Sequence, residues 1–154
     1  MNEMALADAV KLAAARGEVV EAVRGIYTEL QQEIERRRPA CAISGRCCRF
    51  EEYGHRLYVT TIELAAFVAG LDQKPSDQWD GTGCPFQQGK LCGVHRIRPF
   101  GCRAFFCDPT ADQWQQEQYE RFHAKLKAMH GALGVPYYYV EWRAGLRAVL
   151  DLPA

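Results

Sequence analysis

The sequence lacks a net charge, a long apolar run and an apolar leader, and each absence argues against a class of protein. Lysine plus arginine equals aspartate plus glutamate at 19 each, so the 154-residue chain has no long-range field to attract nucleic acid or an anionic membrane. No stretch approaches the roughly 20 apolar residues that cross a bilayer, and residues 1–5 show neither the basic start nor the apolar core of a signal peptide. We therefore expect a soluble, cytoplasmic protein with neither a nucleic-acid nor a membrane partner.

Motifs for catalysis and signs of a second domain are lacking too. We find no glycine-rich fingerprint for a nucleotide or for S-adenosylmethionine, and no Ser/His/Asp-type set can be argued from spacing. A chain of 154 residues is close to the commonest size of one domain, so residues 1–154 are predicted to form one domain. The sequence leaves open whether that domain is an enzyme.

Cysteine, by contrast, is abundant, with seven residues in two glycine-containing segments, 41–48 and 84–107. In a reducing cytosol, clustered cysteines bind metal or catalyse more often than they form structural disulfides, and an odd number cannot pair completely. Glycine beside cysteine lets the backbone approach a metal closely and offer N–H donors to sulfur. We therefore predict a metal-binding region over 41–107, with thiolate ligands from Cys41, Cys47, Cys48, Cys84, Cys92, Cys102 and Cys107.

Arginines flank these cysteines. Four thiolates around zinc or an iron–sulfur core leave a negative site, so neighbouring cations stabilise it, and we predict a cofactor-binding role for Arg98 and Arg103. An ordinary surface role is an equally good interpretation, because exposed ion pairs contribute only about 0–1 kcal/mol. Any single cysteine could also serve as a small buried apolar residue. The spacing lacks the Cys-x2-Cys pairs of zinc fingers and ferredoxins, so it predicts a metal without identifying it.

Apolar periodicity predicts helices on both sides of the cysteines. Apolar residues recur at spacings of three and four from 19 to 34, which predicts an N-terminal helical arm over 1–38 that Pro39 ends. Gly17 and Gly25 each weaken this helix by about 1 kcal/mol relative to alanine, so either can mark a break. The stretch 108–154 is predicted to hold C-terminal helices, the first capped by Asp108 and continuing to Gly131.

A shorter helix is predicted in the middle of the chain. Thr60 and Glu63 have the spacing of a capping box, which predicts a helix from about Ile62 to Ala69 after a short strand at 56–59. For the aromatic group Tyr137–Tyr139 with Trp142, core or dimer packing at helical spacing is favoured over ligand stacking. The predicted fold is mainly α, a small irregular α-helical domain with a minor β element around a cysteine-rich metal-binding loop core.

The cysteine motifs resemble those of the YkgJ-type cysteine-cluster family, a zinc- or iron-chelating domain related to the cysteine-rich part of flagellin lysine N-methylases. The family pattern is Cys-x2-Cys-Gly-x-Cys-Cys, then Cys-Pro-Phe, then Cys-x-(Ile/Val)-Tyr-x2-Arg-Pro-x2-Cys-Arg. The residues on this pattern are Cys41, Gly45, Cys47, Cys48, Cys84, Pro85, Phe86, Cys92, Val94, Arg98, Pro99, Cys102 and Arg103. The resemblance covers residues 41–107.

Two positions depart from the family pattern. Ser44 replaces the second cysteine of the first motif, which weakens Cys41 as a ligand and leaves Cys107 to supply a substitute thiolate. His95 stands in place of the tyrosine, and a role in packing or in supporting a ligand is favoured over direct ligation.

The resemblance to the methylases favours a 4Fe-4S iron–sulfur cluster that serves electron transfer or supports a redox or methyl-transfer partner protein. A structural or storage site for zinc is the first alternative. A thiol redox sensor at Cys47 and Cys48, or at Cys102 and Cys107, is the second. A homo-oligomer through the N-terminal helix is left open.

Overall fold

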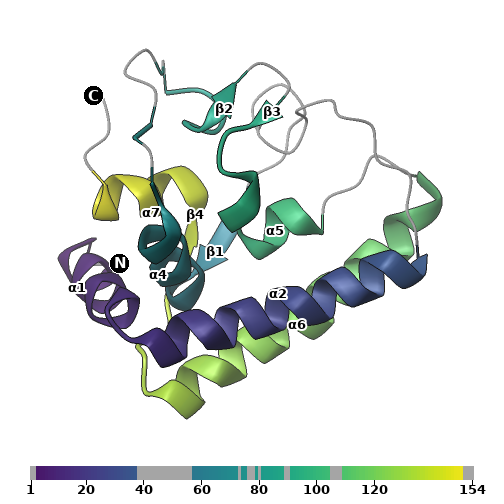
Figure 1. Cartoon of the computed structure of the whole chain (residues 1–154), viewed down its shortest axis with the longest axis horizontal. Coiled ribbons are helices and arrows are strands. Elements are labelled where there is room, and N and C mark those ends of the chain that lie inside the picture. Colours follow the sequence, from purple (N-terminus) through teal and green to yellow (C-terminus); the bar gives the residue numbers. More distant parts are fainter. Residues whose placement is uncertain are drawn as a thin grey trace.

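The computed structural model describes residues 3–37, 57–72, 74–75, 79, 81–88, 91–104 and 109–150, and they form a mainly helical domain with two short two-stranded sheets (Figure 1). This confirms the predicted fold class. The helices are α1 (Glu3–Ala14), α2 (Gly17–Arg37), α4 (Thr61–Gly70), α5 (Phe100–Arg103), α6 (Asp112–Leu133) and α7 (Trp142–Val149), with 3₁₀-helices at His95–Ile97 and Pro109–Ala111. The strands are β1 (Tyr58–Thr60), β2 (Gln87–Gln88), β3 (Leu91–Cys92) and β4 (Tyr139–Glu141).

The N-terminal segment, predicted as one helical arm, forms two helices. The break falls immediately before Gly17, one of the two glycines expected to weaken the helix, whereas Gly25 lies inside α2. Leu6 and Val10 of α1 are completely or almost completely buried. Both helices therefore contribute to the hydrophobic core and lie against the rest of the domain.

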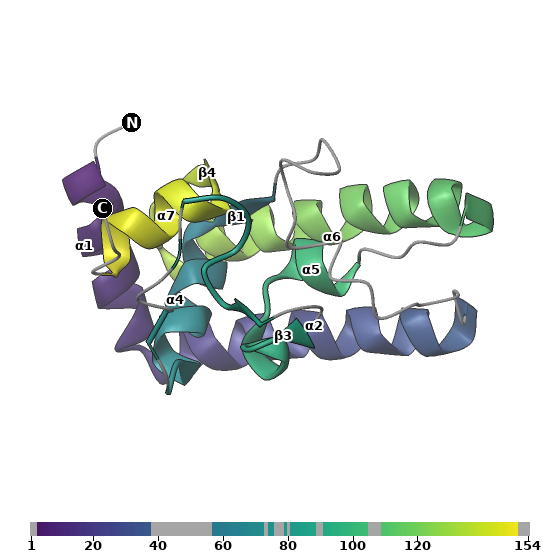
Figure 2. The same ribbon diagram turned by 90° about the horizontal axis from the view of Figure 1, so that it is seen from above.

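The two long helices form the base of the fold. α6 runs antiparallel to α2 and beside it, and α4 packs against α1 and α2 (Figures 1 and 2). Leu30 of α2 and Phe122 of α6 are fully buried. Complete burial of such a side chain contributes roughly 1.5–3 kcal/mol, so these contacts fix the frame on which the shorter elements rest.

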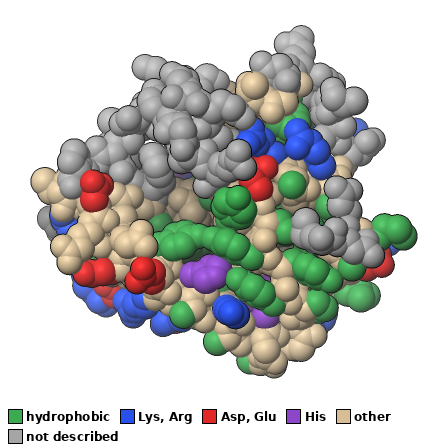
Figure 3. All heavy atoms as spheres, turned by 180° about the vertical axis from the view of Figure 1, so that it is seen from behind, with side chains coloured by type: hydrophobic (Ala, Val, Ile, Leu, Met, Phe, Trp, Pro, Cys, Tyr) green, Lys and Arg blue, Asp and Glu red, His purple; other side chains and the backbone are tan. Residues whose placement is uncertain are grey.

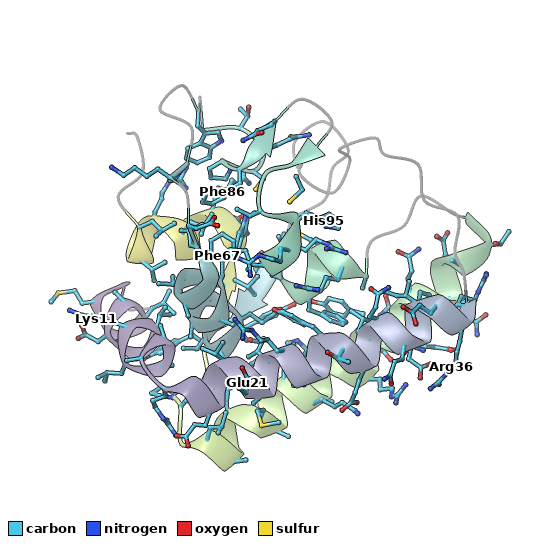
Figure 4. The ribbon with its side chains drawn as sticks, viewed as in Figure 1. Lys11, Glu21, Arg36, Phe67, Phe86 and His95 are labelled. Carbon is cyan, nitrogen blue, oxygen red and sulfur yellow. The ribbon has the colours of Figure 1, made fainter. Side chains whose placement is uncertain are left out.

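A group of aromatic rings packs the hairpin of β2 and β3 against helices α4 and α7. The Phe67 ring of α4 makes edge-to-face contacts with two other rings. The centroid distance is 4.8 Å to Trp142 and 5.4 Å to Phe86. Figure 4 shows Phe86 next to Phe67, between the helices and the hairpin formed by β2 and β3. Aromatic pairs of this geometry contribute about 0.5–1.5 kcal/mol beyond their buried area.

The C-terminal segment contains a strand as well as the predicted helices. β4 pairs antiparallel with β1, with Val59 opposite Val140, so the segment 108–154 is not purely helical. α6 begins at Asp112, after a 3₁₀-helix that starts at Pro109, and continues through Gly131. It stops at Gly134, whose φ of +68° is the left-handed conformation in which glycine commonly ends helices. None of the helices in the described ranges is long and apolar enough to span a membrane.

Candidate metal-binding region and its surroundings

Three of the seven predicted ligands can be placed. Cys84 is buried just before the turn into β2, Cys92 is half-buried at the end of β3, and Cys102 is half-buried in α5. The other four, Cys41, Cys47, Cys48 and Cys107, lie outside the described residues.

Backbone hydrogen bonds fix Cys84 and Cys92 within one hairpin. The Gln87 N–H donates to the Cys84 carbonyl at 3.2 Å, and the Gly93 N–H donates to the Phe86 carbonyl at 2.9 Å. Gln87 is also the cross-strand partner of Cys92. The described part of the second cysteine segment, predicted as a loop core, forms a short hairpin followed by a 3₁₀-helix and one helical turn.

A hydrogen-bond donor points at the sulfur of Cys84. The indole N–H of Trp142 donates to Cys84 Sγ at 3.3 Å, and the exposed fraction of Trp142 is only 1%. Hydrogen bonds to sulfur stabilise the thiolate, the form that binds metal. The sequence offered no signal for this contact, because the two residues are 58 positions apart.

Cys102 is positioned by a buried carboxylate. Glu63 accepts hydrogen bonds from the backbone N–H of Thr60 at 2.8 Å and from that of Phe100 at 3.0 Å. The first bond belongs to the predicted capping box, which is confirmed, and the second reaches the first residue of α5. Burial raises the pKa of Glu63, while the N–H groups of Thr60 and Phe100 act in the opposite direction. Glu63 thus connects the start of α4 to the helical turn that carries Cys102.

Tyr27 and Arg103 complete this buried group. The guanidinium of Arg103 lies 4.1 Å from the centroid of the Tyr27 ring, a cation–π contact. Burial raises the pKa of the Tyr27 phenol well above its usual value. The charges of Glu63 and, to a smaller extent, Cys102 raise this pKa further. Cys102 therefore lies within electrostatic reach of Tyr27 and Arg103.

The two predicted cofactor-binding arginines hold backbone carbonyls. Arg103 donates to the Arg98 carbonyl from Nε at 2.7 Å and to the Arg96 carbonyl from Nη2 at 2.9 Å. Arg98 Nη1 donates to the His95 carbonyl at 2.6 Å and lies 3.1 Å from His95 Nδ1. The side chain of His95 is exposed. These bonds stabilise the backbone between Cys92 and Cys102, and a role of the arginines at a cofactor stays a prediction.

The aromatic residues near the C-terminus pack within the chain. Tyr139 lies in β4, not at a helical position, and its ring stacks on Tyr58 with centroids 5.4 Å apart. His123 meets the edges of the Tyr137 and Tyr139 rings. Figure 3 shows histidine bordered by hydrophobic side chains on the back face. Core packing is confirmed for Trp142, which is buried, whereas the Tyr139 side chain is 39% exposed and packs on the equally exposed Tyr58. The dimer alternative stays a prediction.

Within the described ranges, no group of three or more His, Cys, Asp or Glu side chains is arranged to hold a metal ion. The structure therefore does not bring Cys84, Cys92 and Cys102 together as a three-ligand site, and the seven-thiolate set stays a prediction. No family model matches the chain, and neither a curated protein nor a solved structure matches it. The YkgJ-type resemblance thus rests on the motif residues themselves.

Proposed function

We propose that the chain is a cysteine-cluster metalloprotein that binds a 4Fe-4S iron–sulfur centre, for electron transfer or in support of a partner enzyme. The observation that carries the proposal is the Trp142 N–H bond to the buried Cys84 sulfur at 3.3 Å. Thiolates bound to metal retain charge, and an N–H donor in a site of low polarity stabilises that charge. The residues around Cys84 therefore fit a thiolate ligand.

The surroundings of Cys102 fit the same role. Arg103 follows it directly, and the two side chains interact electrostatically. A positive neighbour favours the thiolate over the thiol. A 4Fe-4S cluster takes four cysteine ligands, which would be drawn from Cys47, Cys48, Cys84, Cys92 and Cys102, with Cys107 as a substitute for the cysteine replaced by Ser44.

A bound 4Fe-4S cluster supplies one-electron transfer at a potential that hydrogen bonds to sulfur and burial adjust. In this chain, the Trp142 N–H would donate to one sulfur, and the buried Phe86 and Phe67 would keep water away from that side. The guanidinium groups of Arg98 and Arg103 would offset part of the negative charge of the thiolates.

The test compares metal bound per chain in three variants purified without oxygen. We expect Cys92→Ser and Cys102→Ser to lose the metal. We expect Cys41→Ser to retain it, because Ser44 replaces the second cysteine of the motif that Cys41 begins. Circular dichroism confirms that each variant is folded. Full retention of metal by both Cys92→Ser and Cys102→Ser would contradict the proposal. Stoichiometric zinc in a colourless protein would replace the iron–sulfur assignment by a zinc site.

A further inference from the structure

A cavity of about 380 Å³ lies between α2, α4 and the segment that leads into α5, and three arginines are among its described lining residues. Arg24 comes from the middle of α2, Arg96 from the 3₁₀-helix and Arg103 from the end of α5. The volume falls in the range of about 300–1,000 Å³ that is usual for small-molecule sites. None of the sequence motifs indicated this cavity.

The cavity is electrostatically one-sided. Three guanidinium groups line it, and no acidic side chain occurs among its described lining residues. Glu21 pairs with Arg24 at 3.1 Å, but both side chains are mostly exposed, and such pairs contribute about 0–1 kcal/mol. Glu63 is buried and is not among the described lining residues, although its charge acts on Arg103. The charged side chains among the described lining residues are therefore all positive.

Structural roles engage only part of the hydrogen-bonding capacity of two of the arginines. Arg96 donates through Nη2 to the Gly70 carbonyl at 3.2 Å, and Arg103 donates to two backbone carbonyls. A guanidinium has five N–H donors, so these bonds leave others for a ligand.

The rest of the lining separates into polar and apolar parts. Thr28 and Gln31 add polar side chains from α2, whereas Ala66 and Ile97 add apolar surface. A ligand that fits this surface has an anionic group and a small apolar part.

We propose that this cavity binds a small organic anion through a phosphate or carboxylate group held by Arg24, Arg96 and Arg103. The planar donor fork of arginine matches both oxyanions in a bidentate arrangement. Arg103 also has a role in the proposed metal centre, whereas Arg24 and Arg96 are held by Glu21 and by the Gly70 carbonyl. The variants Arg24→Gln and Arg96→Gln therefore test the cavity separately from that centre.

The experiment is isothermal titration calorimetry on the full chain with phenyl phosphate and with succinate, in a chloride buffer of constant ionic strength. We expect at least one of the two to bind at one site per chain. Arg24→Gln and Arg96→Gln should each weaken that binding about tenfold or more, because each removes a charge-assisted hydrogen-bond donor. Arg24 is more than half exposed, so its variant should fold even if Arg96→Gln does not.

Arg36→Gln is the matched control. Arg36 also lies on α2 and also pairs with a glutamate three residues before it, at 2.5 Å. Figure 4 shows it at the opposite end of α2 from Glu21. Unchanged binding in this variant supports the proposal, and tighter binding of phenyl phosphate or of succinate identifies the preferred group. Absence of binding by both probes, or equal weakening by Arg36→Gln, would overturn it.

Discussion

The Glu63 carboxylate accepts the backbone N–H of Phe100 at 3.0 Å, although the two residues are 37 positions apart. A side chain in the first turn of α4 thereby holds the beginning of α5, a helix of only four residues. So short a helix is not stable alone, because nucleating a turn costs more than its hydrogen bonds return. Glu63 therefore helps to fix the position of the turn that carries Cys102.

Glu63→Ala should destabilise the protein by about 3 kcal/mol or more, because it leaves the buried N–H groups of Thr60 and Phe100 without their acceptor. Urea unfolding measures the change. Glu120→Ala is the control, since Glu120 is exposed on α6 and accepts a hydrogen bond from the side chain of Gln116. Its effect should stay within about 0.5 kcal/mol. Similar losses in the two variants would show that the Glu63 contacts contribute little.

His130 should make the protein less stable in mild acid. Its Nε2 accepts the Ile62 N–H at 3.2 Å, and its Nδ1 lies 2.7 Å from the Leu126 carbonyl, which describes a neutral ring. Burial lowers the pKa of His130, and this effect outweighs the hydrogen bond to the Leu126 carbonyl, which raises the pKa. Because the folded-state pKa lies below the unfolded value of about 6.5, the stability is present above that pH and decreases as pH falls toward the folded-state pKa.

The melting temperature measured between pH 7.5 and 5 checks this prediction. We expect wild type to lose more stability over this interval than His130→Gln, which cannot titrate. The glutamine variant should be the less stable of the two at pH 7.5, since it loses packing and one of the ring hydrogen bonds. Parallel pH profiles for the two proteins would contradict a neutral, buried His130.

Two glycines should respond to alanine in opposite ways. A Cβ at Gly101 would stand 2.3 Å from Leu57 Cδ1, so Leu57, which is buried, must move, at a cost of about 1–3 kcal/mol. A Cβ at Gly25 meets nothing within 4 Å, and alanine inside α2 should add about 0.5–1 kcal/mol of stability. Denaturant unfolding of the two variants distinguishes these signs, and equal shifts would contradict the packing described at α5.

Trp142→Phe tests the hydrogen bond to Cys84. The change removes the N–H donor but keeps an aromatic ring against Phe67, so we expect a folded protein with a shifted reduction potential or metal absorption band. Trp79→Phe is the control, because the Trp79 indole donates to the Thr82 carbonyl at 2.7 Å and not to a cysteine. Identical spectra and potentials for Trp142→Phe and wild type would remove Cys84 from the proposed ligands.

Local sequence patterns predicted most of the helices, whereas the strand β4 and the contacts around the cysteines depend on residues far apart in the sequence. Thr60 and Glu63 predicted α4 from four residues, because a capping box is a local interaction. The strand β4 escaped prediction because Tyr139–Glu141 is too short to show alternation, and it exists through its pairing with β1. The contacts of Trp142 with Cys84 and of Glu63 with Phe100 depend on how the helices pack, which spacing along the chain does not encode.

The metal content of the full chain purified without oxygen tests the central claim most directly. The account predicts a brown protein with broad absorption near 400 nm and about four iron and four sulfide per cluster. That result would show that the chain binds an iron–sulfur cluster, and loss of the cluster in Cys92→Ser and Cys102→Ser would assign these two residues as ligands. A colourless protein without bound metal, in which these cysteines react with thiol reagents as readily as in the unfolded chain, would contradict it.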